Sequence, residues 1–182
     1  MTAESFYRYL IWARRKLWVS LEALPDEALS KAVIPADGMR CIKDFVAHIA
    51  MVEDGWFRGD LLGQPPVMDR MGRAPTSEDA YWHHQDEPLE SLLEYWQAVE
   101  ADTLARWPEL MAVVAENRTV KLNEDRPETM SADEVVWHAM QHEVRHTAQI
   151  VQMIRLLGHK PPGLDLWYLK AEPSGDVSKG ES

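Results

Sequence analysis

Residues 131–158 read SADEVVWHAMQHEVRHTAQIVQMIRLLG, and this is the most informative helical stretch of the chain. Ser131 is followed three residues later by Glu134, and this spacing is a capping box that marks a helix N-terminus. Gly158 is the natural C-terminal signal, because glycine readily adopts the left-handed conformation that ends many helices. The stretch therefore predicts a helix from about residue 132 to residue 157.

Two amphipathic helices are predicted in the first third of the chain. Apolar residues recur at steps of three and four from about residue 3 to residue 23, and Pro25 closes that segment. A second such pattern runs from about residue 39 to residue 62, where Gly63 and the Pro65-Pro66 pair stop it. Both helices carry one apolar face that needs a partner.

A third helix is predicted to start near Glu87, with Pro88 in its first turn, and its apolar residues extend to Leu104 or Trp107. Residues 63–85 and 115–130 are polar and contain proline, so we expect two long connections there. No alternation of strands and helices is visible, which argues against an α/β fold. The four predicted helices together favour an all-α four-helix bundle with long crossover loops.

The chain has 182 residues, 46% of them hydrophobic, which is enough for one sizeable core. We expect a single helical-bundle domain over residues 1–170. Residues 171–182, AEPSGDVSKGES, are small and polar, and they are expected to form a disordered tail.

Charge and cysteine content restrict the partners and the compartment. Thirty acidic against nineteen basic residues give a net charge of −11, which disfavours nucleic-acid binding. No window is apolar enough for a membrane span, and the N-terminus lacks the apolar stretch of a signal peptide. The single cysteine, Cys41, cannot form an internal disulfide, and we expect a buried or interfacial thiol. A cytoplasmic location fits these features best.

Three histidines, His138, His142 and His146, follow one another at steps of four on the last predicted helix. Neighbours in this series lie one helical turn apart, so two imidazoles can converge on one metal ion. His138 and His146 are separated by roughly 12 Å along the axis, which is too far for both to bind the same ion. A third ligand should come from another helix.

His48 is the best candidate for this third ligand, because it lies among apolar residues of the second predicted helix. His83 and His84 fall in a predicted loop, where solvated histidines are common, and His159 follows the end of the last helix. The alternative is that the histidines only pack in the core without binding metal.

Residues 142–146, HEVRH, match the H-E-x-x-H pattern of zinc proteases. Such proteases place this helix against a β-sheet edge that orients the peptide, and the sequence predicts no strands for one. The pattern therefore favours metal binding more than proteolysis. Glu143 is either a general base or, more simply, a solvated or ion-paired helix residue.

Two segments resemble the DinB superfamily of metal-binding four-helix bundles. They are MRCIKDFVAHIAMVEDGWF (39–57) and HAMQHEVRHTAQIVQMIRLLGHKPPGLDL (138–166). The resemblance implies a site made by His48, His142 and His146, with water in the remaining positions. His138 would then either support one of the ligands or pack beside the site.

One departure from the family pattern lies next to the site. Residues 145–149, RHTAQ, stand where many members have H-H-R-G-Q, so Arg145 need not replace the family's basic residue. Gln149 matches the pattern, and it either orients a metal ligand or is a plain surface residue.

Relatives include thiol-dependent S-transferases and a maleylpyruvate isomerase, so the resemblance implies an enzyme that uses a low-molecular-weight thiol, or a related hydrolase or isomerase. The alternative is a non-catalytic metal-binding module of a stress response. Three imidazoles suit Zn or Ni best, with Fe, Mn or Cu as further choices. The absence of a plausible fourth ligand in the sequence favours an open, catalytic site.

The chain is expected to form a homodimer. Its first and third predicted helices carry more tryptophans than one small core readily absorbs, and exposed aromatic patches often mark interfaces. These tryptophans are Trp12, Trp18, Trp96 and Trp107.

Overall fold

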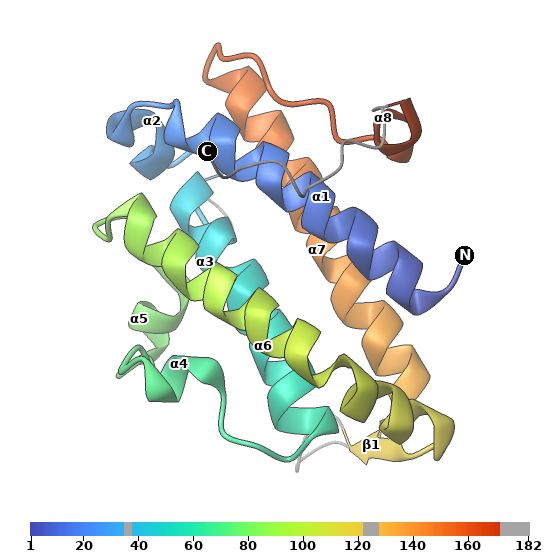
Figure 1. Cartoon of the computed structure of the whole chain (residues 1–182). Coiled ribbons are helices and arrows are strands. Elements are labelled where there is room, and N and C mark those ends of the chain that lie inside the picture. The colour runs from blue at the N-terminus through green and yellow to red at the C-terminus, as the bar shows by residue number, and fades with distance from the viewer. Residues whose placement is uncertain (35–37, 122–127, 172–182) are drawn as a thin grey trace, which may run out of the picture.

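The computed structural model describes residues 1–34, 38–121 and 128–171. Four long helices lie side by side along most of their length (Figure 1). They are α1 (Ala3–Glu22), α3 (Ile42–Glu53), α6 (Leu89–Ala115) and α7 (Ala132–Leu156). α3 packs against both α6 and α7, and α1 packs against α6 and α7. The predicted all-α class is confirmed.

Local signals in the sequence account for the ends of α7. The side-chain oxygen of Ser131 accepts a hydrogen bond from the backbone N–H of Glu134 at 3.2 Å, and the Glu134 carboxylate accepts one from the Ser131 N–H at 2.8 Å. Gly158 adopts a φ of 85°, which a side chain would strain. The helix that carries two of the candidate ligands therefore begins and ends as predicted.

The second predicted helix is divided into two parts. α3 is followed without a break by a π-helix, η1 (Asp54–Leu61), whose wider turns include Gly55 and Gly59. π-helical turns often accompany functional sites. The Asp54 carboxylate accepts hydrogen bonds from the backbone N–H groups of Val67 and Met68 at 2.8 and 3.0 Å, so it anchors the crossover segment.

The loop predicted for residues 63–85 was wrong in part. The third helix, α6, runs from Leu89 through Pro108 to Ala115, where the predicted connection of residues 115–130 begins. The region predicted as a plain crossover loop contains α4 (Val67–Arg70) and α5 (Glu78–Trp82). Two further short helices are α2 (Asp26–Ser30) and α8 (Leu166–Ala171).

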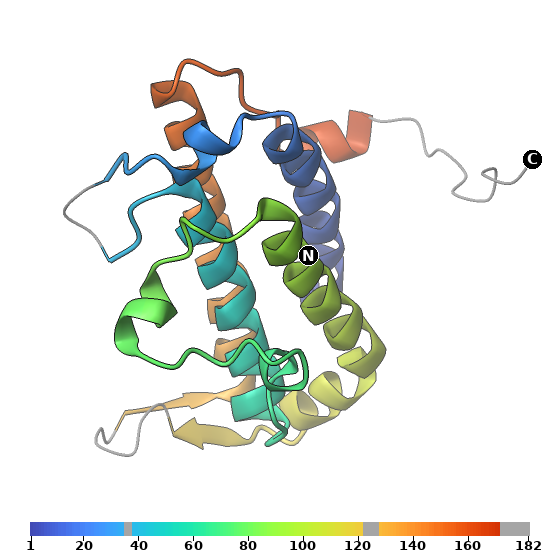
Figure 2. The same cartoon turned by 90° about the vertical axis from the view of Figure 1, so that its left-hand side faces the viewer.

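The connection predicted for residues 115–130 also contains two strands that the sequence did not predict. β1 (Thr119–Lys121) pairs antiparallel with β2 (Thr129–Ser131), with Val120 opposite Met130. Figure 2 shows this hairpin at one end of the bundle, with the crossover segment beside α3. Residues 172–182 of the predicted tail lie outside the described residues.

A layer of charged side chains divides the core into two apolar clusters. One cluster includes Leu17, Phe45 and Trp96, and the other includes Tyr7, Phe57 and Val135. Between them each long helix contributes one buried charged residue, namely Arg14, Glu53, Glu100 and Glu143. Because buried charges must be paired, this layer restricts how the four helices can slide along one another.

Two of the four tryptophans on which the dimer prediction rests are buried in the core of a single chain. Trp18 and Trp96 are buried and meet edge to face, with ring centroids 5.5 Å apart. Trp12 and Trp107 are partly buried. The homodimer stays a prediction. In the described part of the chain, no helix is both long and apolar enough to cross a bilayer.

Candidate metal centre

The three histidines singled out by the sequence lie together between α3 and α7. Nε2 of His142 is 3.3 Å from Nε2 of His48 and 3.0 Å from Nε2 of His146. One ring nitrogen from each residue lies within 4.8 Å of the other two, which is compact enough for the group to hold a metal ion. His142 and His146 are one turn apart on α7, and the packing of α3 against α7 supplies His48.

The spacing of these nitrogens fits a shared ion. Two nitrogens that are each 2.1 Å from an ion lie roughly 3.0 to 3.4 Å apart when the angle between them is octahedral or tetrahedral. The two Nε2–Nε2 distances of 3.3 and 3.0 Å fall in this range. Each neutral imidazole has one lone pair to offer, so an ion here would replace N–H···N hydrogen bonds between the rings.

Gln149 fixes the orientation of one of the three rings. Its side-chain oxygen lies within hydrogen-bonding distance of Nδ1 of His146, so Nδ1 carries the proton and donates it to the amide oxygen. The lone pair of His146 is then on Nε2, which faces His142. Of the two roles that the sequence left open for Gln149, the structure supports the orienting one.

Aromatic side chains enclose the group. The ring of Trp82, from α5 in the crossover segment, lies 5.4 Å from the ring of His48. Phe45, one turn before His48 on α3, lies 5.4 Å from the ring of His146. His48 and His146 are buried as a result, whereas His142 is partly exposed. No sequence pattern indicated Trp82, because its contact with His48 depends on how the crossover segment packs against α3.

Burial lowers the pKa of His142 to about 3, and repulsion from His146, His48 and Arg145 contributes further. The imidazole of His142 therefore stays neutral over the physiological pH range. Only the neutral ring can bind a metal through its lone pair. The environment thus holds this residue in the form that coordination requires.

Arg145 borders the group on the partly exposed side. Its Nη2 donates toward Nε2 of His146 at a distance of 3.2 Å, while the guanidinium itself is exposed to solvent. A positive group at this position favours an anionic ligand beside the histidines. The sequence had left the role of Arg145 open.

The remaining histidines lie apart from this group. His138 is exposed and contacts Trp56, with ring centroids 5.2 Å apart, so it packs beside the site, one of the two roles that the family resemblance implied. The expectation that His84 is solvated was wrong. Its ring is buried, and Nδ1 lies 2.6 Å from the carboxylate of Glu87. His83 and His159 are partly buried and do not join the group.

Glu143 does not act with the histidines, although it follows His142 in the H-E-x-x-H pattern. Its carboxylate accepts two hydrogen bonds from the Arg14 guanidinium, at 2.8 and 2.6 Å, within the buried charged layer. Of the two roles weighed from the sequence, the structure supports the ion pair, although the pair is buried and not solvated. This arrangement and the short hairpin argue against a protease.

Within residues 1–34, 38–121 and 128–171, no fourth histidine, cysteine or carboxylate joins the group. Cys41 is buried at the N-terminus of α3, and burial raises the pKa of its thiol to about 12. The thiolate is therefore disfavoured, and Cys41 offers neither a ligand nor a nucleophile here. A metal ion held by the three histidines would keep open positions.

Comparison with known proteins gives one clear result. The model of the DinB family matches residues 1–178, nearly the whole length of the chain. No curated protein sequence matches it. The family model spans α1 to α8 and includes all three histidines of the candidate centre. The chain belongs to the DinB family.

Proposed function

We propose that this protein is a metal-dependent enzyme that transfers a low-molecular-weight thiol to a small electrophilic substrate. The observation that carries the proposal is the convergence of three imidazole Nε2 atoms without a fourth protein ligand in the described chain. Structural metal sites are usually closed by four protein ligands, whereas catalytic sites keep a position open. Membership of the DinB family supports the same conclusion.

The residues present fit a divalent ion such as Zn or Ni. Neutral imidazole is a good ligand for both, and Fe, Mn and Cu are further choices because three nitrogens do not select strongly among them. A divalent ion with an open position lowers the pKa of a bound thiol or water. Three neutral imidazoles would leave the charge of the ion uncompensated, which favours an anionic ligand in the open position.

The side chains around the centre have distinct tasks in this proposal. Gln149 holds the ring of His146 with its lone pair toward the centre. Trp82 and Phe45 exclude water from the faces of His48 and His146. Arg145 places a guanidinium on the open side, where it can pair with a thiolate or with a carboxylate of the substrate.

The thiol has to come from outside the chain. The only cysteine, Cys41, is buried and its thiol pKa is raised to about 12, so it is a poor nucleophile. Glu143 is held by Arg14 and is not available as a base at the histidines. A single unoxidised cysteine also fits the cytoplasm, where small thiols are abundant.

The experiment is an activity screen of the metal-loaded protein. Glutathione, bacillithiol and mycothiol analogues are each supplied with a chloronitrobenzene, and formation of the thioether is followed by absorbance. We expect turnover with at least one thiol, and its loss in His146→Ala but not in His159→Ala. A protein that binds metal but turns over none of the thiols would contradict the enzyme and favour the non-catalytic stress-response module.

A further inference from the structure

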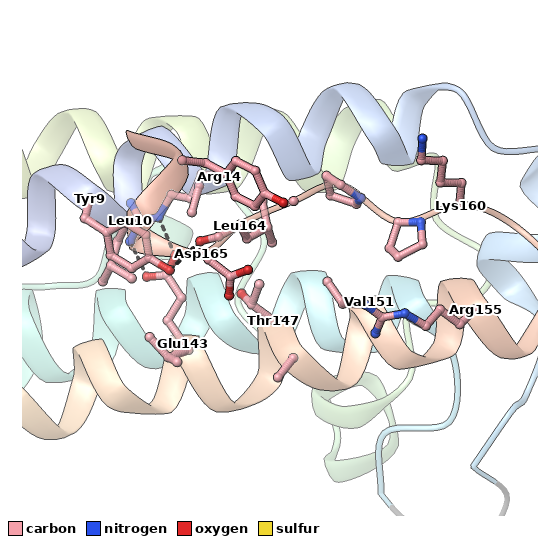
Figure 3. Close-up of a pocket in the computed structure, with 17 residues that line it drawn as sticks. Tyr9, Leu10, Arg14, Glu143, Thr147, Val151, Arg155, Lys160, Leu164 and Asp165 are labelled. Carbon is pink, nitrogen blue, oxygen red and sulfur yellow. Dashed lines mark hydrogen bonds and ion pairs between the residues drawn. The ribbon is translucent and has the colours of Figure 1, made fainter. Parts of the chain in front are cut away.

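A cavity of about 520 Å³ lies between α1, α7 and the segment that leads from α7 to α8 (Figure 3). Glu143, Thr147 and Val151 of α7 line it, and none of the three candidate ligands does. Positions 142 and 143 are turned by about 100° around the helix axis, because an α-helix has 3.6 residues per turn. The cavity is therefore separate from the histidine centre, and its volume suits a small molecule.

One end of the cavity is rich in hydrogen-bond acceptors. Arg14 and Glu143 lie at this end together with Tyr9 (Figure 3), and both charged groups are buried, with exposed fractions of 1% and 5%. The guanidinium of Arg14 donates its hydrogen bonds to side chains within the protein, namely Tyr7, Glu53, Glu100 and Glu143. Arg14 therefore has no N–H left for a ligand, whereas the Glu143 oxygens keep unused lone pairs.

Carboxylates outnumber cations at this end of the cavity. The buried layer contains three carboxylates around the guanidinium of Arg14, and one of them, Glu143, lines the cavity. The hydroxyl of Tyr9 donates to the backbone oxygen of Leu164 at 2.7 Å. Its neighbour Asp165 points its carboxylate into the cavity near Thr147 (Figure 3). Asp165 forms no ion pair within the described part of the chain, so its charge is uncompensated.

The opposite end of the cavity is positive. Arg155, in the last turn of α7, and Lys160, in the following segment, both border it (Figure 3). Neither side chain has an ion-pair partner among the residues that the structure describes. In a chain with a net charge of −11, two unpaired cations at one cavity mouth favour an anionic group there.

The wall between the two ends is apolar. Val151, Pro161 and Pro162 line this middle part and offer no side-chain donors or acceptors. Thr147, beside Asp165, and Arg155 are eight residues apart on α7, which corresponds to roughly 12 Å along the axis. A matching ligand is thus elongated, charged at both ends and apolar in between.

We propose that this cavity binds a linear zwitterion, a small molecule with a primary amine at one end and a carboxylate at the other, joined by an aliphatic spacer. The ammonium group lies with Asp165 and Glu143, and the carboxylate lies with Arg155 and Lys160. The spacer packs along Val151 and the two prolines. This inference does not depend on metal binding or on catalysis at the histidines.

The probe is 8-aminooctanoate, whose charged ends are roughly 10 Å apart when extended. Isothermal titration of the full-length protein should give one saturable site per chain. Octanoate and octylamine, which each lack one of the two charges, should bind about tenfold more weakly. Saturable binding by all three compounds with equal affinity would show a plain apolar groove and overturn the proposal, as would the absence of binding.

Single-charge variants locate the two ends. Arg155→Gln should lower the affinity for 8-aminooctanoate and for octanoate by about tenfold, and it should leave the affinity for octylamine unchanged. Asp165→Asn should lower the affinity for 8-aminooctanoate and for octylamine, and it should leave the affinity for octanoate unchanged. Both residues are exposed, and a thermal melt of each variant checks that the fold is intact.

Arg8→Gln, which removes an exposed cation outside the cavity, is the matched control and should bind all three compounds like the unmodified chain. Uniform weakening of all three compounds in Arg155→Gln or Asp165→Asn would refute the assigned ends.

Discussion

Arg14 of α1 and Glu143 of α7 form a bidentate ion pair, with Nε to Oε1 at 2.8 Å and Nη2 to Oε2 at 2.6 Å, in the middle of the core. Glu143 directly follows His142, so the pair fixes the part of α7 that presents the candidate ligands. Arg14 also contacts Glu53 on α3 and Glu100 on α6. One side chain thereby joins all four long helices at a single level.

Replacing Arg14 by Met should destabilise the fold strongly. The methionine fills part of the volume but leaves three buried carboxylates without their shared guanidinium, and breaking a buried ion pair costs about 3 to 5 kcal/mol. Urea denaturation of the metal-free protein measures the loss. Arg8→Met is the control, because Arg8 pairs with Glu4 on the surface and should contribute less than about 1 kcal/mol. Equal losses in the two variants would show that the charged layer does not organise the bundle.

Replacing Gln149 by Leu should weaken metal binding without unfolding the protein. The leucine cannot accept the Nδ1 proton of His146, so the ring loses the contact that orients its lone pair, and such contacts are worth about 10- to 100-fold in metal affinity. Competition against a chromophoric chelator measures this affinity. Gln152→Leu changes an exposed glutamine on the same helix and should bind metal normally. An unchanged affinity in Gln149→Leu would remove the orienting role.

Acid should destabilise the metal-free protein through His142. Burial and the neighbouring positive groups lower the pKa of His142 to about 3 in the folded state, while an unfolded histidine has a pKa of about 6.5. Below pH 6.5 the unfolded chain therefore binds a proton that the folded chain does not, so stability falls as the pH drops. Between pH 7 and pH 5 this residue should account for a loss of about 2 kcal/mol.

The measurement is urea denaturation in the presence of a chelator at pH 7, 6 and 5. His142→Gln, which cannot be protonated, should lose less stability over this range than the unmodified chain. The same slope in both proteins would show that His142 is not kept neutral by its surroundings.

The homodimer predicted from the tryptophans is tested by light scattering. Trp18 and Trp96 are buried within one chain, so the prediction now depends on Trp12 and Trp107, which are partly buried. Replacing Trp12 by Gln should shift a dimer toward the monomer at micromolar concentration. A monomeric mass for the unmodified chain at high concentration would rule the dimer out.

The helices that carry the fold could be predicted because their signals are local. The Ser131 and Glu134 capping box, and the glycine at position 158, lie within the segment that they delimit. The continuation of α6 through Pro108 could not be predicted, since proline usually ends a helix and the packing of Leu110 outweighs it here. The π-helix after α3 and the three-residue strands are set by tertiary contacts and leave no clear periodic pattern.

The candidate site was predictable for a similar reason, and its surroundings were not. A spacing of four places His142 and His146 on one helix face, and the apolar neighbours of His48 orient that residue toward the bundle interior. The burial of Arg14 was missed, because an arginine in an amphipathic helix is normally solvated. Its three carboxylate partners come from three other helices, and only the folded chain brings them together.

The most direct test is the metal content of the purified protein and of four single-alanine variants, determined by elemental analysis. If His48, His142 and His146 hold one ion, the unmodified chain should carry close to one divalent metal per chain, and replacing any of the three should remove most of it. His138→Ala should keep its metal, because that residue is exposed and one turn away from the group. Equal loss in His138→Ala and His146→Ala, or full occupancy in His48→Ala, would contradict the proposed centre.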